Sequence, residues 1–331
     1  MGNAKKQNGK WPKSMKMRYL LPILMVLSFI SLFIGVSDLS PADLFRMTET
    51  QWQVFTISRV PRLISILIAG SSMSIAGLIM QQLSRNKFVS PTTAGTMDFA
   101  KLGILLSLLI FTGESLLLKM AVAFLFALAG TFLFMQILNG IKFKDTIFVP
   151  LVGLMLGNII NSISTFIAYE NDLIQNISSW FVGDFSMILK GRYELIYISI
   201  PVLIVAYLYA NKFTIAGLGE DFSKNLGLNY KAVLYLGLTI VALITCSVIL
   251  TVGTIPFLGL IVPNIVSIYR GDNLKNSLGI TAVLGALFVL CCDIIGRLVI
   301  YPYEIPINLT VGVIGSAIFV YLLLRRNKNE A

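Results

Sequence analysis

Histidine is absent from the 331 residues of this chain, and the three cysteines, Cys246, Cys291 and Cys292, all lie in apolar runs. Because histidine is the usual general base and the commonest metal ligand, its absence excludes His-based catalysis and argues against a metal site. Cysteines within apolar segments likewise argue against a structural disulfide. We therefore expect the chain to bind no metal or cofactor itself, so that a metal it handles must arrive already chelated.

The sequence motifs of common catalytic sites are also missing. There is no GxxxxGK[ST] phosphate-binding loop, so the chain is not expected to hydrolyse ATP. Neither the HExxH zinc motif nor the GxSxG nucleophile elbow occurs. A membrane-embedded enzyme is therefore the most remote of the possible function classes, and no catalytic residue is assigned.

Charged residues are scarce: 13% of the chain is charged, 56% is hydrophobic and the mean hydropathy is +0.83. Soluble domains average about 25% charged residues. About ten apolar stretches approach the length of ~18 residues or more that can cross the hydrocarbon core. The composition predicts an all-α polytopic membrane protein, with a single transmembrane domain over residues 19–324, a basic cytoplasmic tail at 1–18 and a cytoplasmic tail at 325–331.

The distribution of charge predicts the orientation of the chain in a bacterial cell membrane. Segments assigned to the cytoplasm carry a large excess of Lys and Arg, whereas the outer segments carry more acidic than basic residues. This is the positive-inside pattern, and it places both termini in the cytoplasm. Insertion into the bilayer thus accounts for the net charge of +10, and no nucleic-acid partner is needed to explain it.

Several predicted segments have specific boundaries or features. An outer segment at 37–57 precedes a second span that Arg59 opens, and the sixth span covers residues 194–210. Residues 255–269 contain two prolines and are expected to form a short or irregular helix. On the fifth span, Gly153 and Gly157 have the GxxxG spacing that allows close helix contact.

A polar island at 211–231 interrupts the apolar pattern. Wound as a helix, residues 218–226 place Leu218, Phe222 and Leu226 on one face and charged residues on the other. Gly219 can begin this helix and Gly227 suits the left-handed position after its end. The segment is either a helix that passes the movement of a soluble partner to the spans, or an interfacial helix resting on lipid.

Few charges fall within the predicted spans. Asp98 lies three residues before Lys101, and Asp293 lies four residues before Arg297, so each pair could form an internal ion pair. An ion-coupled secondary carrier usually needs uncompensated carboxylates or broken-helix ion sites at mid-depth. Carboxylates paired in this way argue against that alternative without excluding it.

Four stretches, in this order along the chain, resemble the iron–siderophore and cobalamin permeases of type II ABC importers. They are residues 58–95, the loop GLGEDFSKNLGL, the segment GTIPFLGLIVPN, and GALFVLCCDIIGRLVIYPYEIPINLTVGVIGSAIFVYLLLRR. Within that family, RNKFVSPTTAGTMDFAKLG and PNIVSIYRGDNL are similar to the subgroup that imports ferric catecholate siderophores of the petrobactin type. The resemblance covers nearly the whole chain.

The resemblance implies the type II importer permease fold, with ten spans in each of two permease subunits around a central path. The second permease subunit is either an identical copy or a paralogue, and the subgroup resemblance favours a paralogue. It further implies two ATPase subunits, which bind ATP and magnesium, and an extracellular or periplasmic binding protein for the siderophore. The chain itself would be a transport subunit for a ferric siderophore, not an enzyme.

Site residues follow from the resemblance by position. The family's coupling helix matches residues 218–228, so the residues implied to meet the ATPase are Gly217, Gly219, Glu220, Leu226 and Gly227. Outer arginines that dock the binding protein match Arg59, Arg62 and Arg297. Arginine suits docking because its planar fork pairs with carboxylates, but snorkelling or local pairing, such as Arg297 with Asp293, is the alternative.

The sequence departs from the family pattern at three places. Asn86-Lys87 stands where Asn-Pro is common, Pro263-Asn264 where Pro-His is common, and residues 97–100 replace Ser-Gly-Ala. The third departure brings Asp98 and Lys101 near the expected path, where they serve either a different cargo or packing alone.

Polar or soft residues on the fifth span complete the candidate path. Together with the charge pair, the set is Asp98, Lys101, Met155, Asn158 and Asn161. Hydrogen bonding between helices is the alternative role for the two asparagines.

Overall fold

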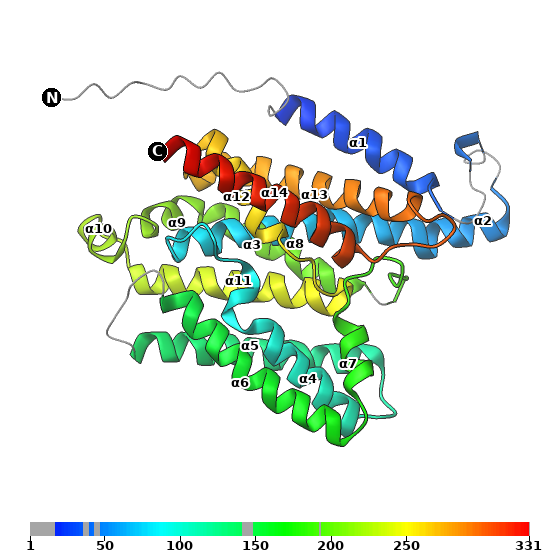
Figure 1. Ribbon diagram of the computed structural model, residues 1–331, viewed down its shortest axis with the longest axis horizontal. Coiled ribbons are helices and arrows are strands. Elements are labelled where there is room, and N and C mark those ends of the chain that lie inside the picture. The colour runs from blue at the N-terminus through cyan, green and yellow to red at the C-terminus, as the bar shows by residue number, and fades with distance from the viewer. Residues whose placement is uncertain (1–16, 36–39, 43–46, 141–147, 192, 331) are drawn as a thin grey trace.

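The structure is a computed structural model that describes residues 17–35, 40–42, 47–140, 148–191 and 193–330. Within these ranges every regular element is a helix, as predicted for an all-α membrane protein. Most long helices run along the longest axis of the molecule (Figure 1). Helices satisfy their backbone hydrogen bonds internally, which is what a chain in lipid requires.

The elements of the first half are α1 (Met17–Phe33), α2 (Glu49–Val54), η3 (Phe55–Arg59), α3 (Val60–Leu83), η4 (Pro91–Ala94), α4 (Thr96–Ile110), α5 (Leu116–Gly140), α6 (Phe148–Glu170) and α7 (Ile174–Phe181). Those of the second half are η5 (Glu194–Ile198), α8 (Ser199–Leu208), α9 (Ala210–Ala216), α10 (Glu220–Asn225), α11 (Tyr230–Val252), α12 (Leu258–Arg270), α13 (Leu274–Leu298) and α14 (Ile307–Glu330). The predicted C-terminal tail thus continues α14 as helix to Glu330, while residues 1–16 of the predicted N-terminal tail lie outside the described residues.

Five helical stretches of the described chain are long and apolar enough to cross a membrane, and a sixth if one bent pair counts as a single span. Shorter apolar helices are Met17–Phe33, Leu258–Arg270 and Ile307–Leu322. Length and composition therefore establish a multi-pass membrane protein but do not confirm the predicted count of about ten spans. The predicted short helix at 255–269 is confirmed as α12, which begins after Phe257 and contains Pro263.

The helix that contains the predicted second span begins before Arg59. A continuous helical stretch runs from Glu49 to Leu83, so much of the predicted outer segment is helix. Thr48 begins it with a capping box, in which its hydroxyl accepts from the backbone of Gln51 and the Gln51 side chain accepts from the backbone of Thr48. A π-helical turn, η3, precedes Pro61, and the carbonyl of Ile57, to which a proline cannot donate, accepts instead from the backbone N–H of Lys190 at 3.0 Å.

The predicted sixth span, residues 194–210, ends where the helix breaks, and a further short helix follows the break. Residues Glu194–Leu208 and Ala210–Ala216 are bent by 63° at Tyr209. Part of the predicted polar island is therefore α9, and only the short α10 stands apart as the predicted amphipathic helix. Tyr230 begins α11 after Asn229, whose side chain caps the helix by accepting from the backbone N–H of Ala232.

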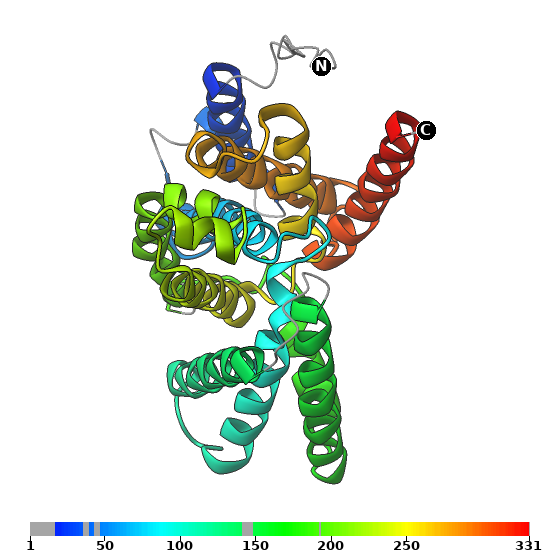
Figure 2. The same cartoon turned by 90° about the vertical axis from the view of Figure 1, so that its left-hand side faces the viewer.

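The core lies where α3 packs between α11, α12 and α13. In α3 and α11, 72% of the most apolar window is buried, against 28% in α5 and 22% in α6. Gly77 of α3 permits the closest approach, since a Cβ there would lie 1.9 Å from the carbonyl oxygen of Gly259 on α12. Figure 2 shows α4, α5 and α6 as a group to one side of this core.

Candidate functional site

The short helix α10 stands at one end of the molecule, beyond the ends of α3 and α11 (Figure 1). Gly219 precedes it with φ of 112° and ψ of 167°, a conformation that only glycine adopts readily. Gly227 follows it with φ of 75°. The predicted helix at 218–226 and its glycine boundaries are therefore confirmed, although the helix itself is limited to Glu220–Asn225.

Ser223 folds α10 back onto the preceding helix. Its hydroxyl is fully buried and lies 2.6 Å from the carbonyl oxygen of Gly219 and 3.0 Å from that of Ile215 at the end of α9. Ser223 was not among the residues predicted from the sequence. Its four-residue spacing from Gly219 was the available signal, because a serine can donate to the carbonyl four residues earlier.

The segment around α10 contacts two core helices. A Cβ on Gly217 would lie 2.0 Å from Gln82 Nε2 near the end of α3, and one on Gly219 would lie 3.3 Å from Arg85 Nη1. Thr214 on α9 accepts a hydrogen bond of 3.1 Å from the backbone N–H of Leu274, the first residue of α13. A displacement of α10 would therefore reach the end of α3 through Gly217 and the start of α13 through α9.

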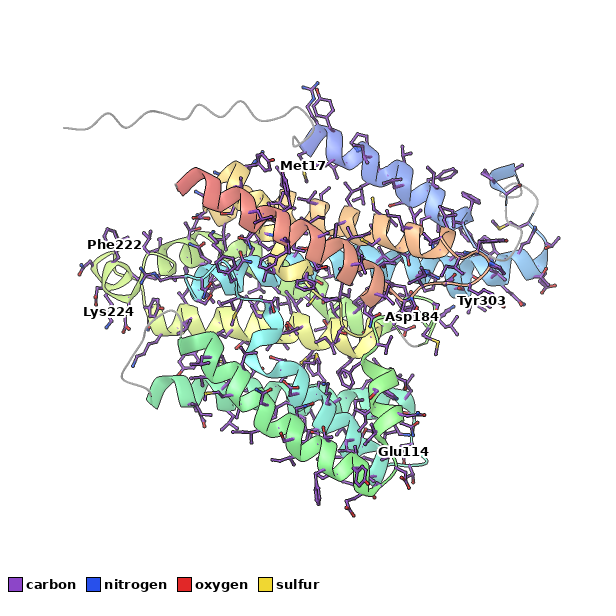
Figure 3. The ribbon with its side chains drawn as sticks, viewed as in Figure 1. Met17, Glu114, Asp184, Phe222, Lys224 and Tyr303 are labelled. Atoms are coloured by element: carbon purple, nitrogen blue, oxygen red, sulfur yellow. The ribbon has the colours of Figure 1, made fainter. Side chains whose placement is uncertain are left out.

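The outer face of α10 is apolar and exposed. Leu218, Phe222 and Leu226 are 53%, 60% and 59% exposed. Phe222 lies within α10, and the two leucines flank it. Phe222 and Lys224 project away from the body of the molecule in Figure 3. Glu220 Oε1 lies 3.0 Å from Lys224 Nζ, and this hydrogen bond and charge raise the pKa of Lys224. The result is an apolar surface with an acidic start, held on a short loop.

A polar cluster at the same end joins the loop after α3 to the start of α13. Lys87 donates to Asp272 Oδ1 and, at 2.9 Å, to Ser267 Oγ. Burial raises the pKa of Asp272, but the hydrogen bonds from Lys87 and Ser267 outweigh it and leave the pKa below its usual value. Asn264 Nδ2 donates to the carbonyl of Lys87 at 2.8 Å, so this departure from the family pattern has a structural role.

A buried charge network lies toward the opposite end, where α3 meets α13. Arg62 Nη2 lies 2.8 Å from Asp293 Oδ1, and Arg62 Nη1 lies 2.7 Å from Glu304 Oε2. Arg297 Nη2 lies 2.6 Å from Asp293 Oδ2, so the predicted pair of Arg297 with Asp293 is confirmed. Arg62, Asp293 and Arg297 are each less than 10% exposed. The network therefore ties α3, α13 and the segment before α14 together.

The predicted docking arginines all face inward in this structure. Arg297 donates to the carbonyls of Ser31 and Ile34 at 2.9 Å, and Arg59 also donates to Ile34 at the end of α1. Arg59 and Arg62 are each 8% exposed. Docking of a binding protein stays a prediction for these residues, and the structure restricts it, because their side chains would first have to leave these internal acceptors.

Three of the five predicted path residues meet and two do not. Lys101 Nζ donates to Asn161 Oδ1 at 3.4 Å and lies 3.8 Å from Asp98 Oδ1, which confirms the predicted charge pair. Met155 and Asn158 lie instead on the exposed face of α6. Asp98 packs against Gly157 of α6, where only a glycine leaves enough room, because a Cβ on residue 157 would lie 2.5 Å from Asp98 Oδ2.

The sequence and the fold match known permeases. Residues 23–325 match the FecCD transport family. The petrobactin import system permease protein YclN of Bacillus subtilis (strain 168) is 69% identical over 94% of this chain and 99% of its own length. The ferric-anguibactin transport system permease protein FatD of Vibrio anguillarum is 38% identical over 92% of this chain and 98% of its own length.

A solved structure has the same fold. A metal-chelate type ABC transporter in an inward-facing conformation superimposes with a TM-score of 0.80 at 23% identity, over 92% of this chain and 97% of that one. The resemblance in the sequence to type II importer permeases is thereby confirmed, as is the expected type of fold. With its helices in the permease arrangement and its family match running from residue 23 to residue 325, the chain belongs to the FecCD transport family.

Proposed function

We propose that this chain is the permease subunit of an ATP-driven importer that moves a ferric siderophore, of the catecholate-bearing petrobactin class, into the cytoplasm by alternating access. Two relatives that match it over nearly their full lengths are named for petrobactin and ferric-anguibactin import. The observation that carries the proposal is α10, a short helix flanked by the exposed Leu218 and Leu226, on a segment that contacts the end of α3 and, through α9, the start of α13.

The mechanism begins at α10. Nucleotide binding and hydrolysis on a partner ATPase move the helix, with Leu226 and Phe222 seated in the partner and Gly217 and Gly219 allowing the close approach to α3. Because α3 and α13 are packed backbone to backbone, a push at their ends tilts them as rigid rods. Tilting opens the path at one side of the bilayer and closes it at the other.

The partners follow from the surfaces that the single chain leaves uncovered. A second permease subunit, for which the resemblance favours a paralogue over an identical copy, would cover part of α6, where Leu154, Met155 and Ile159 are each more than half exposed. Two ATPase subunits, with ATP and magnesium, would bind at the α10 end. A siderophore-binding protein would dock at the opposite end. The C-terminal end of α14 lies toward the α10 end (Figure 1), in keeping with a cytoplasmic C-terminus.

An ion-coupled carrier is the rival. In the described part of the spans, Asp98 and Asp293 each have a basic partner within 4 Å, so neither carboxylate offers an uncompensated charge to a driving ion. The two functions differ in energy source. Uptake into vesicles that contain ATP but have no ion gradient supports the importer, whereas uptake that needs a gradient and proceeds without ATP supports the carrier.

The substrate is tested in a strain that lacks the chain. Radioactive iron supplied as ferric petrobactin should enter cells only when the chain is restored together with its partners. Iron supplied as a ferric trihydroxamate should not depend on the chain and serves as the control. Equal uptake of ferric petrobactin with and without the chain would contradict the proposal.

A further inference from the structure

A cavity of about 300 Å³ lies among α4, α6 and α7, beside the segment before α12 and the start of α14. Lys101, Asn161, Ser178, Phe181, Thr254 and Asn308 are among the residues that line it. Its volume is at the lower end of the range for small-molecule pockets. Two of the path residues expected from the sequence, Lys101 and Asn161, line it, whereas Met155 and Asn158 lie outside it.

The charge in this cavity is positive. Lys101 is the cation among the described lining residues, and these include no carboxylate. Its counter-ion, Asp98, points toward Gly157 on α6 and does not line the cavity. An ammonium placed within a membrane span is costly, so it is more often functional than incidental.

The ammonium group of Lys101 can donate more hydrogen bonds than it makes. An ammonium carries three N–H groups, and in the described part of the chain Lys101 makes a single hydrogen bond, the long one of 3.4 Å to Asn161. Its distance of 3.8 Å from Asp98 Oδ1 is that of a loose ion pair. The Phe181 ring completes the surroundings, with its centroid 5.9 Å from Nζ. A cation beside an aromatic ring suits a ligand that is both anionic and aromatic.

We propose that this cavity is a subsite on the transport path for one anionic catecholate arm of the ferric chelate, with Lys101 binding the oxygens and Phe181 contacting the ring. The assignment rests on the proposed function. A ferric tris-catecholate carries net negative charge, because three doubly deprotonated catecholates outweigh Fe(III). The hydroxyl oxygens of Ser178 and Thr254 and the amide of Asn308 add polar groups around the same space.

The charge of the cavity can be measured without transport. Ser178 lines the cavity on α7, and its neighbour Ser179 does not, so Ser178→Cys and Ser179→Cys form a matched pair. Each is made in the full importer complex in membranes, with the native cysteines Cys246, Cys291 and Cys292 replaced. The readout is the ratio of modification rates by an anionic and a cationic methanethiosulfonate reagent.

Lys101→Gln should lower the anionic-to-cationic ratio at position 178 by about tenfold, as expected for one charge about 6 Å away in a well-hydrated site. Lys101→Arg should preserve the ratio, and position 179 should be unaffected by either change. Asp98→Asn, which removes the counter-ion and keeps Lys101, should raise the ratio and provides a second reading if Lys101→Gln does not accumulate. A ratio at position 178 that neither substitution alters would overturn the proposal.

Ligand binding is then read as protection. A ferric tris-catecholate should slow modification at position 178 when Lys101 is present and not in Lys101→Gln, whereas a neutral ferric trihydroxamate should not protect. Equal protection by both chelates, or protection that persists in Lys101→Gln, would overturn the subsite. Failure of the proposed function looks different: the intact importer would not take up ferric catecholate at all, while the charge preference at position 178 would still be measurable.

Discussion

The two ends of the molecule use the same kinds of charged side chains in opposite ways. At one end, Arg62, Asp293 and Arg297 form ion pairs of 2.6 to 2.8 Å with little solvent exposure. At the other, Glu220 and Lys224 pair at 3.0 Å on α10, where the lysine side chain is 60% exposed. Buried pairs are integral to a fold, because removing one partner strands the other charge away from water.

Exposed pairs such as Glu220 and Lys224 contribute little to stability, since water and salt replace either partner. In the sequence the two pairs look alike, because Asp293 with Arg297 and Glu220 with Lys224 have the same four-residue spacing. Their difference in burial separates a structural role from a surface role. Charges of the buried network hold α1, α3 and α13 in place, whereas those of α10 can exchange their partners for those of another protein. Substitutions at the two ends should therefore have different consequences.

The largest effect is expected from Asp293→Ala. It leaves Arg62 and Arg297 buried without their shared carboxylate and should destabilise the fold by about 3–5 kcal/mol, or prevent accumulation in the membrane. Thermal aggregation of the purified importer measures the loss. Glu304→Gln is the matched control, because Arg62 then keeps Asp293 and the loss should be smaller. An unchanged transition temperature for Asp293→Ala would show that the network is not structural.

Glu220→Arg should leave the fold intact and abolish coupling. The substitution reverses the charge at the start of α10 and removes the pair with Lys224, yet strands no buried group. Uptake of ferric siderophore should fall at least tenfold, while the amount of chain in the membrane stays normal. Lys224→Ala, which breaks the same pair without reversing the charge at the helix start, should retain most uptake. Wild-type uptake by Glu220→Arg would contradict the coupling role.

Gly217→Ala should have an intermediate effect. Its Cβ would lie 2.0 Å from Gln82 Nε2, but this is the end of a flexible side chain that can move. We expect a cost of about 1 kcal/mol in stability and a few-fold loss of uptake. Combining it with Gln82→Ala should restore part of both, as a double-mutant cycle would measure. Strictly additive losses would mean that the contact carries no coupling.

The smallest effect concerns Asp272, whose pKa is held below its usual value by its hydrogen bonds, despite burial. A carboxylate with a lowered folded pKa adds stability that is present above the unfolded pKa and is lost as pH falls through the folded value. Because the side chain is 56% exposed, Asp272→Asn should cost less than about 1 kcal/mol at neutral pH. Wild type should lose this advantage as pH falls below 3.8. A difference between the two that persists at lower pH would refute the linkage.

Much of the α10 end was predictable because its signals are local. Gly219 and Gly227 bound the helix segment through their own backbone conformations, whatever the rest of the chain does. Ser223 was missed, although its bonds are also local, because a serine amid charged residues looks like solvent-exposed surface. The contact of Gly217 with Gln82 could not be found in this way, since it joins residues that are far apart in the sequence.

The network at the other end was only half predictable. Helical spacing identified the pair of Asp293 with Arg297. The bonds of Arg62 to Asp293 and Glu304 could not be identified in this way, because more than 200 residues of sequence separate them. The same limit applies to the candidate path. A polar residue on an apolar helix, such as Asn158 or Asn161, gives no sign of which face will be covered, and only Asn161 meets Lys101.

By itself the sequence determined the membrane class of the protein, its family resemblance and the short helix at 220–225, because hydropathy, local periodicity and glycine positions act over a few residues. Tertiary structure decided which arginines are buried, where α8 and α9 bend apart, and that Lys101 faces a cavity while Asp98 turns away from it. These features depend on how the helices pack against one another, and packing brings together residues whose separation along the chain carries no signal.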